Sequence, residues 1–87
     1  MCGIIGAASS RNVGKLLVQG LHKMEYRGYD SAGIALHQKD SIFNLRSLGK
    51  VKLLEDGMIQ ERPKSKLGIA HTRWATHGKP SQENAHP

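Results

Sequence analysis

The chain has 87 residues, which is enough for one small domain and too few for two. With 38% hydrophobic and 23% charged residues it should fold as a globular protein, and we expect neither a membrane span nor a secretory signal, since no long apolar run exists. The formal charge of +6 comes from scattered residues, and only 5% of the residues are aromatic, so nucleic-acid binding is not expected.

The first half of the chain predicts a strand, a helix and a β-hairpin. The apolar run "CGIIGAAS" (residues 2–9) is typical of a buried strand, and Asn12 is suited to cap a helix. The apolar residues that recur at helical spacing after it are Val13, Leu16, Leu17, Leu21 and Met24. Gly28 should end this helix in a turn. Residues 31–38 and 41–49 then alternate as two strands of a hairpin.

The second half predicts a helix, a strand and a closing loop. In "KVKLLEDGMIQ" (residues 50–60), Val51, Leu54 and Met58 stand at helical spacing, while Gly57 should make this helix short or irregular. "KLGIAHTRWAT" is typical of a buried strand, and the polar stretch after it, with Gly78 and Pro80, of a loop. The order of elements predicts a mixed α/β sheet covered by helices, and the polar end predicts a fragment that stops within its domain.

The single cysteine, Cys2, follows the initiator Met1 directly. One cysteine cannot form a disulfide within the chain, so a reducing, cytoplasmic setting is expected. A free cysteine is most often a small buried hydrophobe. If Met1 is removed, however, the same residue carries a thiol and an α-amine that both titrate near neutral pH. The amine can then take up the thiol proton, so one residue can act as nucleophile and base.

Arg73 stands where the last predicted strand opens into the loop, and its planar guanidinium matches a carboxylate in two hydrogen bonds. Thr76 and His77 follow within reach of the same ligand. An arginine in a loop usually makes only a solvated surface contact, so the residues alone make an anion pocket plausible without favouring it. His71, His77 and His86 are separated by six and nine residues, a spacing that matches no compact zinc motif, so no metal site is expected.

Taken together, "MCGI", "YRGYDSAGIA" and "HTRWATHGKPSQENAHP" resemble the family of isomerizing glutamine–fructose-6-phosphate aminotransferases, which are class II glutamine amidotransferases. The resemblance covers the whole chain. It implies an N-terminal-nucleophile hydrolase fold, an αββα sandwich that is incomplete in this fragment. Residues 1–87 would be the N-terminal portion of the glutaminase domain, and the sugar-phosphate isomerase domains would be absent.

The resemblance also implies roles for matched residues. Cys2 would attack the side-chain amide of glutamine through a γ-glutamyl thioester, and ammonia would pass to fructose 6-phosphate. The residues implied to hold the α-carboxylate of glutamine are Arg73, Thr76 and His77. Trp74 would belong to the lid over glutamine, and Arg27 would support the nucleophile. No cofactor is expected, and the full-length protein is expected to form a homo-oligomer.

Three alternatives stay open at this stage. A purine-pathway amidophosphoribosyltransferase resembles the chain, but it carries tyrosine and serine where Trp74 and Ala75 stand here. A glutaminase-like regulatory module without catalysis and a small basic binding fragment are the others. The family's oxyanion-hole residues would lie beyond Pro87, so the 87 residues alone should have little glutaminase activity.

Overall fold

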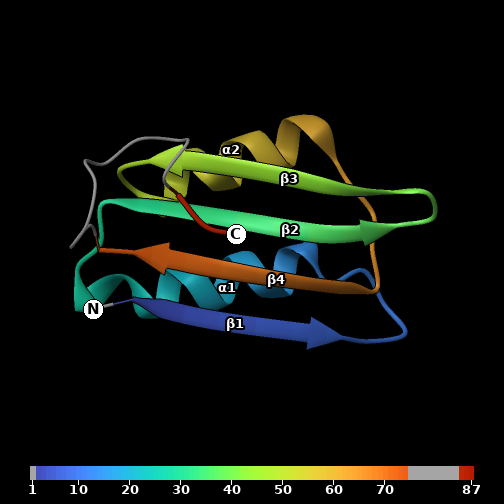
Figure 1. Ribbon diagram of the computed structural model, residues 1–87, viewed down its shortest axis with the longest axis horizontal. Coiled ribbons are helices and arrows are strands. Elements are labelled where there is room, and N and C mark those ends of the chain that lie inside the picture. The colour runs from blue at the N-terminus through green and yellow to red at the C-terminus, as the bar shows by residue number, and fades with distance from the viewer. Residues whose placement is uncertain (1, 75–84) are drawn as a thin grey trace.

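The computed structural model describes residues 2–74 and 85–87, with two helices packed on one four-stranded sheet (Figure 1). The elements in chain order are β1 (Gly3–Ala8), α1 (Gly14–Met24), the 3₁₀ turn η1 (Glu25–Arg27), β2 (Ser31–Gln38), β3 (Ser41–Leu48), α2 (Val51–Glu61) and β4 (Leu67–Arg73). The order and type of these elements confirm the interpretation drawn from hydrophobic periodicity.

All described strand pairs are antiparallel, and the sheet order is β1-β4-β2-β3. The last strand in the sequence therefore lies between the first and the second (Figure 1). Gly3 pairs with Thr72 across β1 and β4, and Ser31 pairs with Arg73 across β2 and β4. This insertion brings the beginning of the chain, the beginning of β2 and the end of β4 to the same end of the sheet.

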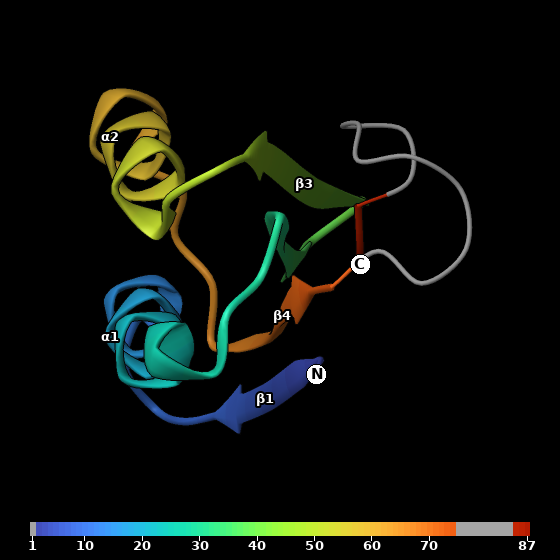
Figure 2. The same cartoon turned by 90° about the vertical axis from the view of Figure 1, so that its left-hand side faces the viewer.

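Both helices cover the same face of the sheet (Figure 2), and the core lies between the two layers. The core residues without solvent exposure are Val13, Leu17, Leu21, Ala32, Ile34, Leu36, Val51 and Leu54. The opposite face carries Ile4, Ile42 and Ile69, which are exposed in the described chain. The described residues thus provide one helix layer and one sheet of the expected sandwich. Neither of these two helices is long and apolar enough to cross a membrane.

The beginning of α1 differs in detail from the prediction. Val13, one residue later than expected, occupies the N-cap position, and no side chain caps it. Asn12 instead bridges two segments, because its Oδ1 accepts hydrogen bonds from the backbone N–H of Gly14 (3.3 Å) and of Ser65 (3.1 Å). Leu16, expected on the buried stripe, is 52% exposed, and Val18 is buried in its place. Packing against the sheet fixes which side of the helix is covered.

The prediction that Gly57 shortens the second helix is wrong. α2 runs for 11 residues, as many as α1. A Cβ atom on Gly57 would lie 2.8 Å from Cδ2 of Leu45 on β3, so the missing side chain leaves room for Leu45. Close packing of the helix on the sheet therefore outweighs the low helix propensity of glycine, which costs about 1 kcal/mol relative to alanine.

Replacing Asn12 by alanine should loosen the junction between α1 and the segment before β4. The substitution leaves the amides of Gly14 and Ser65 without their acceptor, at a cost of about 1–2 kcal/mol. Hydrogen exchange at these two amides, measured in the full-length protein that carries this chain, should accelerate about 5- to 30-fold. Asn12→Asp keeps the accepting oxygen and is the matched control. Equal acceleration in both variants would show that the side-chain oxygen does not hold the junction.

Candidate active site

Cys2 lies at the open end of β1, one residue before Gly3, and is exposed. The backbone N–H of Gly3 donates a hydrogen bond to Oγ1 of the buried Thr72 (3.1 Å). Because Gly3 pairs with Thr72, the antiparallel register places Cys2 next to Arg73. A Cβ atom on Gly3 would lie 2.5 Å from Sδ of Met24 on α1 and 2.9 Å from that same Oγ1, so glycine after Cys2 leaves room for both side chains.

Arg73 ends β4 and is only 9% exposed. It has Cys2 beside it on the β1 side and pairs with Ser31 on the β2 side. Its carbonyl oxygen accepts a hydrogen bond from the backbone N–H of Asp30 (2.8 Å). The carbonyl of Asp30 in turn accepts one from the N–H of Gly49 (3.0 Å). The backbone of Arg73 is therefore fixed between the ends of two neighbouring strands.

Trp74 follows Arg73 and is about half exposed, at 48%. Its indole ring packs beside Gly28, because a Cβ atom there would lie 3.3 Å from Cζ3 of the ring. Gly28 has φ = +79°, a conformation that favours glycine, so both the backbone and the neighbouring ring disfavour a side chain at this position. The turn between η1 and β2 is thereby packed against the end of β4.

The three sequence stretches singled out by their residues thus meet at one end of the sheet. The structure brings Cys2, Arg73 and Trp74 together there, with the backbone of Arg27 in η1 close by in the same turn as Gly28. The side chain of Arg27 lies outside the described part of the chain. Thr76 and His77 also lie outside the described residues. An exposed cysteine and an arginine on neighbouring strand ends are a combination suited to attack on a substrate that carries a carboxylate.

Two histidines meet on the face of the sheet opposite the helices. The rings of His71 and His86 pack edge to face, with centroids 5.1 Å apart. Burial, then the neighbouring His86 and Arg73, lower the pKa of His71 below its ordinary value, which favours a neutral imidazole at physiological pH. Within residues 2–74 and 85–87, no group of three or more His, Cys, Asp or Glu residues could hold a metal ion.

Sequence reasoning missed the crossing of residues 85–87 over the sheet. A Cβ atom on Gly33, in the middle of β2, would overlap the carbonyl oxygen of His86. Ala85 is buried, and the carbonyl of Pro87 accepts a hydrogen bond from Nε of Arg46 (2.7 Å). Glycine inside an apolar strand is the signal that could have predicted this close backbone approach.

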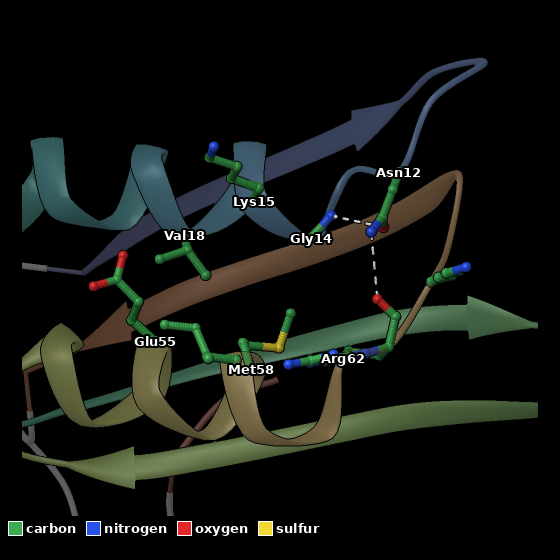
Figure 3. Close-up of a pocket in the computed structure, with 10 residues that line it drawn as sticks. Asn12, Gly14, Lys15, Val18, Glu55, Met58 and Arg62 are labelled. Atoms are coloured by element: carbon green, nitrogen blue, oxygen red, sulfur yellow. Dashed lines mark hydrogen bonds between the residues drawn. The ribbon is translucent and has the colours of Figure 1, made fainter.

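A cavity of about 500 Å³ lies between the two helices, near the beginning of α1 and the end of α2 (Figure 3). Its lining residues are Asn12, Gly14, Lys15, Val18, Glu55, Met58, Ile59, Arg62, Pro63 and Lys64. Since α1 begins here and ends near Gly3, the cavity lies at the opposite end of the helix layer from Cys2. Cys2, Arg73 and Trp74, the predicted site residues whose side chains the structure describes, do not line it, so the cavity is separate from this part of the candidate site.

Sequence comparison finds close relatives over the whole chain, although no family model matches it. It is 53% identical over 87 residues to the glutamine–fructose-6-phosphate aminotransferase (isomerizing) of Acinetobacter baylyi. It is 57% identical over 88 residues to that of Haemophilus ducreyi and 56% identical to that of Legionella pneumophila strain Paris. All of this chain is covered each time, and the chain spans only 14% to 15% of the relatives' own length.

Comparison with solved structures gives the same fold. The chain superposes over its whole length on 18% of the allosteric regulatory enzyme of purine biosynthesis, with a TM-score of 0.82. The sequence identity is 24%, so this likeness supports the fold alone. It confirms the fold class expected from the sequence, a mixed α/β arrangement of the N-terminal-nucleophile type.

Proposed function

Because this chain is homologous over all of its 87 residues to the glutamine–fructose-6-phosphate aminotransferases, we propose that it carries the nucleophile of a glutamine-hydrolysing site. The observation that carries the proposal is the exposed Cys2 beside Arg73 at the open end of β1. In this site Cys2 acts as the nucleophile once Met1 has been removed. Arg73 binds the α-carboxylate of glutamine, with Thr76 and His77 as further ligands. Trp74 belongs to the lid, and Arg27 supports the nucleophile.

The reaction follows from thiol chemistry. The α-amine of Cys2 accepts the thiol proton, and Sγ attacks the side-chain amide carbon of glutamine. The C–N bond breaks, and the leaving nitrogen takes the proton and departs as ammonia. The γ-glutamyl thioester that remains is attacked by water, which releases glutamate and restores the thiol. Holding the carboxylate at Arg73 places the amide at a fixed distance from Cys2, so the attack needs little further ordering.

The ammonia acceptor proposed here is fructose 6-phosphate. The names of the relatives support this acceptor, and the purine-pathway alternative is supported only by a fold likeness at 24% identity. Stabilisation of the oxyanion requires donors that the family resemblance places beyond Pro87. Loss of one such donor typically lowers the rate by about 10²–10³. We therefore expect the 87 residues alone to hydrolyse glutamine far more slowly than the full-length protein.

The experiment that tests this proposal is labelling of the full-length protein with an alkylating glutamine analogue, followed by mass spectrometry of its N-terminal peptide. We expect Met1 to be absent and the label to sit on Cys2. Excess glutamine should protect Cys2, because substrate and analogue would compete for the same site. Labelled, active protein that retains Met1 would contradict the proposed α-amine mechanism.

A further inference from the structure

His22, on α1, stands between two carboxylates from different elements. Its Nδ1 lies 2.7 Å from Oε1 of Glu25 in η1, and its Nε2 lies 3.4 Å from Oε2 of Glu55 on α2. About a third of each of these three side chains is exposed, so the cluster is in contact with solvent. One imidazole ring therefore connects both helices and the turn that leads to β2.

A neutral and a protonated imidazole ring differ in the number of hydrogen bonds that they can donate to these two carboxylates. A neutral imidazole has one N–H and one lone pair, so it donates to one carboxylate and turns its lone pair toward the other. The imidazolium form donates to both. The hydrogen bond with Glu25 is the main cause that raises the pKa of His22 above its ordinary value of 6.5, and Glu55 adds to this effect. The geometry thus favours the cationic form.

Glu25 is also hydrogen-bonded to Tyr29, which lies next to the segment that supports the candidate site. Its Oε2 accepts a hydrogen bond from the hydroxyl of Tyr29 (2.7 Å), and the Tyr29 oxygen accepts one from the backbone N–H of Val51 (2.6 Å), the first residue of α2. Asp30, the next residue after Tyr29, donates its backbone N–H to the carbonyl of Arg73. A continuous series of short contacts therefore leads from His22 to the backbone of Arg73.

We propose that His22 is a positioning residue: as a cation it ties α1 to α2 through Glu25 and Glu55, and thereby fixes the Tyr29–Asp30 segment that supports Arg73. Loss of its proton releases Glu55 and leaves Tyr29 and Asp30 less firmly held. The effect on glutamine binding rests on the proposed function, whereas the helix tie itself does not.

Other charged groups around the cluster limit the size of the effect. Lys52 lies 3.8 Å from Glu55 and 3.1 Å from Asp56, and the positive charge of Lys50 acts on Glu25. The strands beneath α1 direct no titratable side chain toward it. Their helix-facing residues are Gly3, Ile5, Ala7, Gly68, Ala70 and Thr72. Because Lys52 can still pair with Glu55 when His22 is neutral, the change in the positioning of Arg73 should be modest.

The sign of the pH dependence follows from the raised pKa of His22. Stabilisation by the tie is complete below the ordinary pKa of 6.5 and is lost as the pH rises through the higher pKa of the folded protein. Between about pH 6 and about pH 8, the KM for glutamine of the native full-length protein should accordingly rise. This rise should be about two- to fivefold larger than the rise in a variant whose side chain at position 22 is always charged. The kcat for glutamine hydrolysis should change less than the KM.

Three variants test this. His22→Arg keeps a cation at every pH and should hold the low KM, whereas His22→Gln is neutral and should show the high KM even at about pH 6. His37→Gln is the matched control, because His37 lies at the exposed end of β2, and it should follow the native pH profile. The positioning role would be overturned if the KM of His22→Gln divided by the native KM were the same at every pH. It would also be overturned if His22→Arg did not keep the low KM.

A second measurement does not depend on enzyme activity. In NMR titration of the full-length protein, the His22 ring should titrate above 6.5, and hydrogen exchange at the Val51 amide should accelerate in His22→Gln. A His22 pKa at or below 6.5, or unchanged exchange at Val51, would overturn the tie. If the tie is found in a protein that does not hydrolyse glutamine, the proposed function fails and the structural inference stands.

Discussion

Replacement of Cys2 by alanine should abolish glutamine hydrolysis in the full-length protein, with a loss of about 10⁴-fold or more, because the group proposed to form the thioester is gone. The thiol is exposed at the end of β1 and is not part of the core, so the substitution should leave the fold intact. Cys2→Ser is the matched variant, since it keeps an N-terminal nucleophile of similar size but of much weaker reactivity at neutral pH. Release of glutamate from glutamine is the direct measurement.

Ammonia supplied as a salt provides the control for the Cys2 variants. If ammonia is the only product that passes to the sugar phosphate, added ammonium should restore amination of fructose 6-phosphate while glutamine should not. Glutamine-dependent synthesis that survives in Cys2→Ala would contradict the proposed nucleophile and would favour the regulatory, non-catalytic alternative. Loss of both reactions would instead indicate that the substitution has damaged the protein beyond the thiol.

Hydrophobic periodicity predicted the elements well because the buried positions of a helix or strand recur at a regular spacing, and the apolar residues of the sequence show that spacing. The structure completely buries the residues that these spacings select. They are Ala32, Ile34 and Leu36, which alternate along a strand, and Leu17 and Leu21, which stand at helical spacing. Periodicity indicates which face of an element is covered, but it does not indicate which strands are neighbours. The pairing of β1 with β4 joins Gly3 to Thr72, which are 69 residues apart, and no local pattern encodes it.

The same limit applies to the candidate site. Cys2 and Arg73 could each be singled out by residue type, but only the insertion of β4 beside β1 places them together. Family resemblance had joined the three stretches earlier without giving a geometric reason. The His22 cluster was not predicted at all, since its members come from α1, η1 and α2, and each one alone has the character of a solvated helix residue. Gly57 shows the opposite case, where tertiary packing overrides a correctly estimated local propensity.

Replacement of Arg73 by lysine should raise the KM for glutamine about 10- to 100-fold. Lysine keeps the positive charge but loses the planar pair of hydrogen bonds that a carboxylate can accept from arginine, and hydrogen bonds to charged groups contribute about 1.5–3 kcal/mol each. Calorimetric titration of glutamine into the Cys2→Ala protein, with and without Arg73→Lys, measures binding without turnover. The dissociation constant for glutamine should increase by the same factor as the KM, because the contact with the carboxylate is lost in the ground state and the transition state alike.

Arg46→Lys is the matched control for that substitution. Arg46 stands on β3, on the same face of the sheet as Arg73, and its Nε binds the carbonyl of Pro87, away from Cys2. The same chemical change at this position should leave glutamine binding within about twofold of the parent, because no substrate carboxylate is assigned to it. Equal weakening by both substitutions would mean that lysine disturbs this face of the sheet in general. A selective effect at Arg73 would instead assign the α-carboxylate to the guanidinium of the residue that the register places beside Cys2.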